Sequence, residues 1–173
     1  LDNLDKQIHI AATPRQKINL FERMAGIRED EFLDHDKAAQ TLESILAIAA
    51  AHENALTGLV RHYRALGRWE DVIRLYERHL AIVTDDKRRV ELLLAMGRVL
   101  VEQVGSPERA SHAFEKVLEI DPNHGGALEA LAHVRAASGD ALAALSAVES
   151  LAERATKPET KADRWLQAAK ILE

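Results

Sequence analysis

The chain has 173 residues, close to the size of one ordinary domain, and its 23 basic and 28 acidic side chains give a formal net charge of −5. A content of 47% hydrophobic residues argues against wholesale disorder, and the absence of cysteine excludes disulfides and thiolate metal sites. The acidic balance argues against nucleic-acid binding, and the longest apolar run, residues 42–51, is shorter than the ~20 residues of a membrane span. We therefore expect no membrane span, and with no signal peptide visible we expect a cytoplasmic protein.

Apolar periodicity predicts helices along the whole chain. Few aromatics and only four prolines leave long stretches of good helix formers. In chain order, the pattern predicts the last turns of a helix at 2–12 and then helices at 14–32, 35–50, 53–66, 69–83, 86–104, 107–120, 125–138, 141–155 and 158–172. Pro14 after Thr13 and Pro107 after Ser106 are typical of helix N-caps. Gly67 and Gly139 lie between predicted helices, where φ is often positive.

The segment 69–80 shows the pattern clearly. Apolar side chains recur at three- and four-residue steps, the period of a buried helix stripe: Trp69, Val72, Ile73, Tyr76 and Leu80. Charged side chains occupy its other side. Such a helix buries its stripe only against a neighbour, so the sequence predicts stacked helices.

The chain resembles itself under a 72-residue shift. With that shift Leu20 falls on Leu92 and Met24 on Met96, and matches continue as far as Gly67 on Gly139. Each 72-residue unit contains two pairs of predicted helices. A small or β-branched residue lies at the start of the second helix of each pair. These residues recur at intervals close to the known repeat lengths of helical solenoids. They are Ala38, Val72, Ala110 and Ala144.

The first and last of these intervals are each about 34 residues, the helix–turn–helix period of the tetratricopeptide repeat (TPR) family, which the chain resembles. The bulky position of the family's first helix matches Phe21, Leu56, Leu93, Leu128 and Trp165. The aromatic of its second helix matches Tyr76 and Phe114, and its terminal proline survives as Pro122. The chain departs at His79, where a small residue is usual, and at Arg28 and Arg135, where Tyr63 lies in another repeat. These departures suggest looser packing at those positions.

The resemblance implies an all-α fold, a right-handed α-solenoid of antiparallel helix pairs forming one TPR-like superhelix over 1–173. The repeats would span about 14–50, 53–83, 86–120 and 125–155, with partial repeats at 1–12 and 158–173. Both ends then look cut from a longer solenoid. Terminal repeats normally need a polar outer face, and ends without one expose apolar surface. We therefore expect end-to-end self-association.

The resemblance also implies a function, a non-catalytic scaffold for protein–protein interaction that holds a peptide in a concave groove lined by first helices. In the family, the residue after the small position of each first helix tends to face that groove. Here these residues are Gly26, Arg61, Arg98, His133 and Lys170, and Asn54, Thr57 and Arg64 extend the strip on the same helix face. A row of donors suits an acidic peptide or a C-terminal carboxylate. The alternative is a charged face that is only solvated, in which acidic side chains offset the basic ones. These acidic residues are Glu22, Glu91 and Glu129.

Catalytic and metal motifs are missing from the sequence. No phosphate-binding glycine motif occurs, and the helix that begins at His52 lacks the second histidine of a zinc protease. His35, between Asp34 and Asp36, is typical of a capped turn, and His79 of a structural histidine in a helix contact. We therefore expect no enzyme, no metal and no cofactor.

Two other functions stay open. The repeats could act as a structural spacer within a larger multidomain protein, with an empty groove. RNA binding is a third hypothesis, because other helical repeats bind single strands. The net charge and the scarcity of aromatics for base stacking count against it.

Overall fold

The computed structural model describes residues 1–154 and 158–171. Every element among these residues is a helix, which confirms the predicted all-α fold. The chain divides into two compact units, unit 1 over Leu1–Ile82 and unit 2 over Val83–Glu173.

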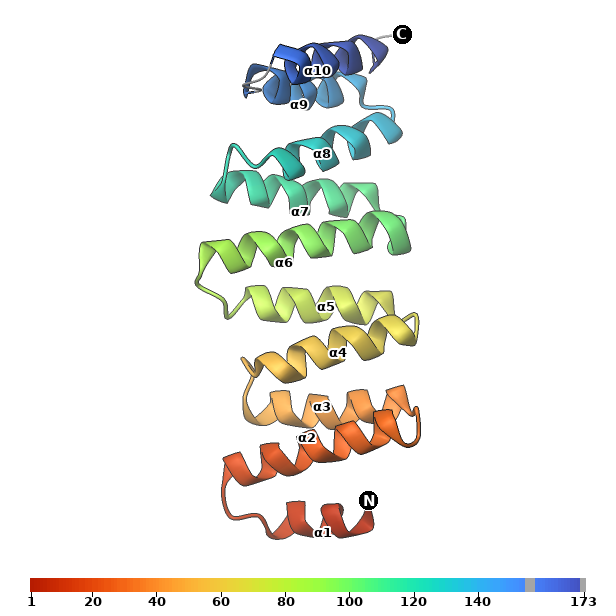
Figure 1. Cartoon of the computed structure of the whole chain (residues 1–173), viewed down its shortest axis with the longest axis vertical. Coiled ribbons are helices and arrows are strands. Elements are labelled where there is room, and N and C mark those ends of the chain that lie inside the picture. Colours follow the sequence, from red (N-terminus) through yellow and green to blue (C-terminus); the bar gives the residue numbers. More distant parts are fainter. Residues whose placement is uncertain (155–157, 172–173) are drawn as a thin grey trace. The chain divides into compact units, whose positions relative to one another are not determined.

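Unit 1 is a row of five helices in which each helix packs on the next. They are α1 (Asp2–Ile10), α2 (Pro14–Asp30), α3 (His35–Ile48), α4 (Glu53–Ala65) and α5 (Trp69–Leu80). Short loops connect successive helices, which run in opposite directions (Figure 1). The apolar stripes meet in the core, where the largest fully buried side chains of α3, α4 and α5 are Ile45, Leu59 and Ile73.

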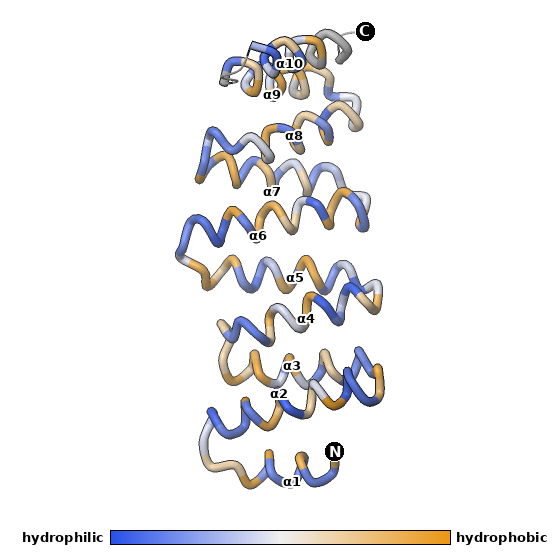
Figure 2. Tube along the Cα trace, viewed as in Figure 1, coloured by the Kyte–Doolittle hydropathy of each residue, from blue (hydrophilic) through white to orange (hydrophobic). Residues whose placement is uncertain are grey.

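Unit 2 repeats this arrangement. It contains α6 (Asp86–Val99), the π-helical segment η1 (Leu100–Val104), α7 (Pro107–Ile120), α8 (Gly125–Ala137), α9 (Ala141–Arg154) and α10 (Pro158–Ile171). In both units the hydropathy alternates along each helix, as expected of helices with one buried stripe (Figure 2). The 72-residue shift places the starts of α2 to α5 on the starts of α6 to α9, so the sequence repeat is also a structural repeat.

Two predicted helix ends differ from the observed ones by more than two residues. The helix predicted at 86–104 is α-helical only to Val99, and its last five residues form the π-helical η1. The helix predicted at 69–83 ends at Leu80. The residues after Leu80 form the loop to α6, whose N-cap is Asp85. The Asp85 carboxylate accepts a hydrogen bond from the Arg88 N–H at 2.8 Å.

The predicted caps are largely as expected. Thr13 and Gln16 form a reciprocal capping box in front of Pro14. Gly67 and Gly139 have φ of 65° and 78°, the left-handed conformation predicted for them. Ser106 is the N-cap of α7 with Pro107 in the first turn, as predicted, although its side chain makes no capping bond.

Polar bonds join helices at the positions where we expected looser packing. The Arg28 guanidinium on α2 donates to the Lys37 carbonyl at 2.9 Å and to the Thr41 hydroxyl on α3. The Arg135 guanidinium on α8 donates to Glu115 on α7 at 2.5 Å. At both positions, therefore, the arginine forms charge-assisted bonds to a neighbouring helix.

One close helix contact in unit 2 depends on a residue without a side chain. Phe114 on α7 is 1% exposed, and its ring lies against Gly97 on α6. A Cβ atom built at Gly97 would lie 2.4 Å from Cε1 of that ring, far inside van der Waals contact. The aromatic ring thus occupies the space that any other residue at position 97 would fill.

Replacing Phe114 with alanine should lower the free energy of unfolding by ~3–5 kcal/mol, because it removes a fully buried ring and leaves a cavity. Urea denaturation followed by circular dichroism measures the change. A loss below ~1 kcal/mol would contradict the burial of the ring.

Replacing Gly97 with alanine should destabilise the chain by ~1–3 kcal/mol, because the ring cannot move aside in a packed core. Gly26 is the matched control, since it lies inside α2 and a Cβ there has no neighbour within 4 Å. Gly26→Ala should raise the free energy of unfolding by up to ~1 kcal/mol through helix propensity alone. Equal effects of the two substitutions would contradict the contact.

Candidate functional site

The structure brings three of the predicted site residues together on α4. Asn54, Thr57 and Arg61, with Gly58 between them, line an open hollow of about 270 Å³, which we call the α4 hollow. Their spacing of three, one and three residues places them on one face of the helix. Gly58 packs against α3, because a Cβ atom built there would lie 2.7 Å from Cδ1 of Leu42.

The polar groups of the α4 hollow are bonded to carboxylates of α2. The Asn54 amide donates to Glu22 at 3.3 Å, and the Arg61 guanidinium donates to Glu29 at 2.5 Å. Arg61 is nevertheless 64% exposed, so most of its donors face solvent. The sequence analysis placed Glu22 near the strip but missed Glu29, whose contact with Arg61 joins residues 32 positions apart.

The other predicted site residues lie elsewhere. The Arg64 guanidinium donates to the Tyr76 hydroxyl of α5 at 3.3 Å, and Arg64 does not line the α4 hollow. In unit 2, Arg98 on α6 and His133 on α8 are exposed, and neither has a polar partner within the part of the chain that the structure describes. Lys170 belongs to α10, but its side chain lies outside the described residues. A strip that joins these residues to Arg61 stays a prediction.

A buried histidine lies directly behind Arg61. His62 is 1% exposed, and its Nδ1 lies 3.1 Å from Nδ1 of His35. Its Nε2 lies 3.7 Å from the Glu29 carboxylate that also binds Arg61. Burial lowers the pKa of His62, while Glu29 partly opposes that shift and Arg61 and His35 add to it. The sequence analysis missed this pair, because the two histidines are 27 residues apart and no motif relates them.

The other histidines and acids agree with structural roles. Asp34 is the N-cap of α3 and accepts a hydrogen bond from the Lys37 N–H at 3.0 Å. His79 is buried, and its Nε2 lies 3.4 Å from Glu53 of α4. Within residues 1–154 and 158–171, no group of three or more histidines and carboxylates is arranged to hold a metal ion. No helix in this part of the chain is long and apolar enough to span a membrane.

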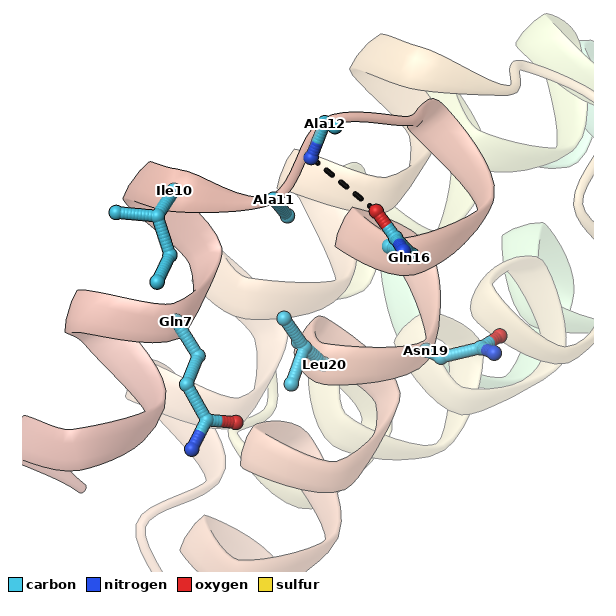
Figure 3. A pocket seen from close by; sticks show the side chains of 7 residues that line it. All are labelled: Gln7, Ile10, Ala11, Ala12, Gln16, Asn19 and Leu20. Carbon is cyan, nitrogen blue, oxygen red and sulfur yellow. Dashed lines mark hydrogen bonds between the residues drawn. The ribbon is translucent and has the colours of Figure 1, made fainter.

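A second hollow lies between α1 and α2 (Figure 3). Its volume is about 500 Å³, and its lining includes Gln7, Ile10, Gln16, Asn19 and Leu20. The Gln16 side chain accepts the Ala12 N–H at 3.2 Å and so belongs to the cap of α2. The lining carries amide and apolar groups but no charge, and it therefore favours no ligand class over another.

Exposed apolar residues occur on the last helix. Trp165 and Leu166 on α10 are 43% and 58% exposed. Large exposed apolar side chains side by side are one requirement for association. The expected end-to-end self-association stays a prediction.

Comparisons with known proteins agree on the fold. A family model described as tetratricopeptide repeat matches residues 55–90, which hold α4 and α5. Among solved structures, YrrB, a TPR protein with an unusual peptide-binding site, is 18% identical over 97% of this chain and 81% of its own, with a TM-score of 0.58. MamA is 16% identical over 90% and 87%, with a TM-score of 0.57.

A tetratricopeptide repeat protein from Parabacteroides merdae is 17% identical over 99% of this chain and 68% of its own, with a TM-score of 0.58. No curated protein sequence matches the chain significantly. At these identities the solved structures show a common fold, and function must be argued from the residues themselves.

The stability of the chain should decrease as the pH falls below the ordinary histidine pKa of 6.5, because the unfolded chain then binds a proton that folded His62 resists. Above that pH both states leave His62 neutral, and it contributes no pH dependence. Urea denaturation at several pH values measures the slope, which should be smaller in His62→Gln. His9→Gln, an exposed substitution on α1, is the control and should keep the slope of the parent. An unchanged slope in His62→Gln would contradict the role of this histidine.

Proposed function

We propose that this chain, a TPR-like repeat protein, is a non-catalytic scaffold that binds a peptide or an extended segment of a partner protein along its first helices. The fold supports the coarser part of the proposal, because stacked helix pairs offer extended surfaces for other proteins. YrrB, a protein of similar fold, has a peptide-binding site.

The observation that carries the proposal is the α4 hollow. Three residues selected from the sequence as peptide contacts line one cavity, and they combine an amide, a hydroxyl and a guanidinium. Amide and hydroxyl groups can bond a peptide backbone, while a guanidinium favours a carboxylate. This chemistry favours an acidic peptide, or one that ends in a free carboxylate.

The contact with Glu29 still allows Arg61 to bind such a ligand. A guanidinium carries five N–H donors, and only Nη2 is bonded to Glu29. The exposed remainder can bind a second carboxylate, which would sit between Arg61 and Thr57. In unit 2 the exposed Arg98 and His133, together with Lys170, would extend the interaction to further residues of the same partner.

The internal pairing also favours the runner-up function, a structural spacer. Glu22 and Glu29 already satisfy Asn54 and Arg61 within unit 1, as they would in a surface that only needs to be solvated. The two functions make opposite predictions about peptide binding.

Selection from a displayed library of random peptides with free C-termini should enrich acidic sequences on the parent chain. Arg61→Glu combined with Arg98→Glu should lower the affinity for the selected peptides about tenfold or more, because a repelling charge replaces each guanidinium. Binding to the parent should weaken with added salt, since the contacts are exposed.

The matched control combines Arg74→Glu with Lys116→Glu, which makes the same charge change on exposed residues of α5 and α7 outside the α4 hollow. It should keep the parent affinity, and circular dichroism should show that every variant is helical. If the double variant binds as tightly as the parent, or if no peptide is enriched, the spacer replaces the scaffold.

A further inference from the structure

Unit 2 contains a further surface hollow that the sequence analysis did not anticipate. It has a volume of about 500 Å³, and its lining residues lie on α7, α8 and α9. These helices follow one another in unit 2 (Figure 1). We call it the α7–α9 hollow, and the residues that line it include Glu115, Leu118, Glu119, Arg135, Ala147 and Ser150. Its deepest apolar side chains, Leu128 and Leu131 on α8, are buried.

The internal repeat shows why space opens here. The 72-residue shift matches α7, α8 and α9 with α3, α4 and α5 of unit 1. Leu75 on α5 is the counterpart of Ala147 and is buried in its unit. The exchange of leucine for alanine removes three carbon atoms from this position. Tyr63, the counterpart of Arg135, is likewise buried.

In unit 1 the carboxylate of Glu43 accepts hydrogen bonds from Tyr63 and from Arg78. The Tyr63 hydroxyl donates to Glu43 at 3.1 Å, and Nη1 of Arg78 on α5 donates to both Glu43 oxygens at 3.1 and 2.9 Å. Burial, followed by the charge of Glu43, raises the pKa of Tyr63 to about 12, so its hydroxyl remains a donor at neutral pH. Glu43 thus receives donors from both α4 and α5.

In unit 2 the counterpart of Glu43 keeps only one of these donors. Arg135 on α8 bonds Glu115 at 2.5 Å, but the position of Arg78 is taken by the uncharged Ser150. The other oxygen of Glu115 lies 3.9 Å from Nδ1 of His112 on the same helix. Glu119, where unit 1 has Ala47, adds an exposed second carboxylate to the rim. The rim therefore carries two carboxylates and one guanidinium above an apolar floor.

We propose that the α7–α9 hollow binds a partner segment that carries a leucine or aromatic side chain close to an arginine or lysine. The apolar side chain would fill the volume that Leu75 occupies in unit 1, over Leu118 and Ala147. The basic group would bind Glu115 and Glu119 as Arg78 binds Glu43. The negative rim selects a basic segment by charge complementarity.

This site goes beyond the proposed function, because it lies on other helices than the α4 hollow and selects the opposite charge. A partner could contact both surfaces through two segments of different composition. The two sites can therefore be tested separately on the same full-length chain.

The test uses short, capped, alanine-based peptides and the full chain. The first peptide has leucine and arginine three residues apart, the spacing of Leu75 and Arg78 in α5. The second has glutamate in place of the arginine, and the third has alanine in place of the leucine. Fluorescence anisotropy measures affinity, and the methyl NMR signals of Leu131 and Ala147 report the place of binding. The first peptide should bind about tenfold more tightly than either of the others and shift these signals.

Two variants test the same point from the side of the protein. Ala147→Leu combined with Ser150→Arg restores the side chains of unit 1, and it should weaken binding of the first peptide about tenfold while leaving the chain helical. Glu119→Ala removes one rim charge from an exposed position and provides the test if the filled variant does not fold. This substitution should lower the affinity for the first peptide severalfold.

The control is Ala137→Leu combined with Ala136→Arg, which adds the same side chains to exposed positions of α8 outside the hollow and should not change affinity. Equal binding of the three peptides, no binding, or full affinity in the filled variant would overturn the proposal. If the chain self-associates and only the filled variant is monomeric, the occupant is a second copy and the peptide proposal is wrong. Enrichment of acidic peptides at the α4 hollow would stand in either case.

Discussion

The constraint on which both units depend is that an amphipathic helix can bury its apolar stripe only against another helix. Most of the helices α1 to α10 are short enough to be marginal alone in water, and their stability comes from the neighbours on which they pack. Side-chain size then decides how closely two helices approach. The ring of Phe114 over Gly97 shows one limit, where a residue without a side chain admits a complete aromatic ring. The α7–α9 hollow shows the opposite limit, where the small side chain of Ala147 leaves space that no larger neighbouring side chain fills.

This constraint also explains how much of the fold could be predicted from the sequence. Helix positions follow from local periodicity, and loops from glycine and capping residues, so the predicted bounds of α7 were correct at both ends. The left-handed Gly67 was predictable for the same local reason. The π-helical end of α6 was not, because η1 has the composition of an ordinary helix and its hydrogen-bonding pattern leaves no local signal in the sequence.

The candidate site was less predictable, because its contacts join side chains of different helices. Helix periodicity correctly grouped Asn54, Thr57 and Arg61, since all three lie on one face of α4. It also selected Arg64, whose long side chain instead reaches Tyr76. The pairing of His62 with His35 and Glu29 depends on the spacing between α2, α3 and α4, which no single helix contains.

The internal repeat provides information that neither unit gives alone. Two copies of one arrangement share a backbone, so a difference between them comes from the side chains. Glu43 and Glu115 occupy the same position, yet Glu43 is bonded to Arg78 of α5, whereas the counterpart of Arg78 in unit 2 is Ser150. The carboxylate of Glu115 lacks the donor that Arg78 gives to Glu43, and alanine and serine replace Leu75 and Arg78 of unit 1. This carboxylate can therefore bind a donor from another molecule. The same comparison applied to α4 and α8 pairs Arg61 with His133, both exposed on first helices. Duplicated units that keep a common core can therefore present different surfaces to different segments of a partner.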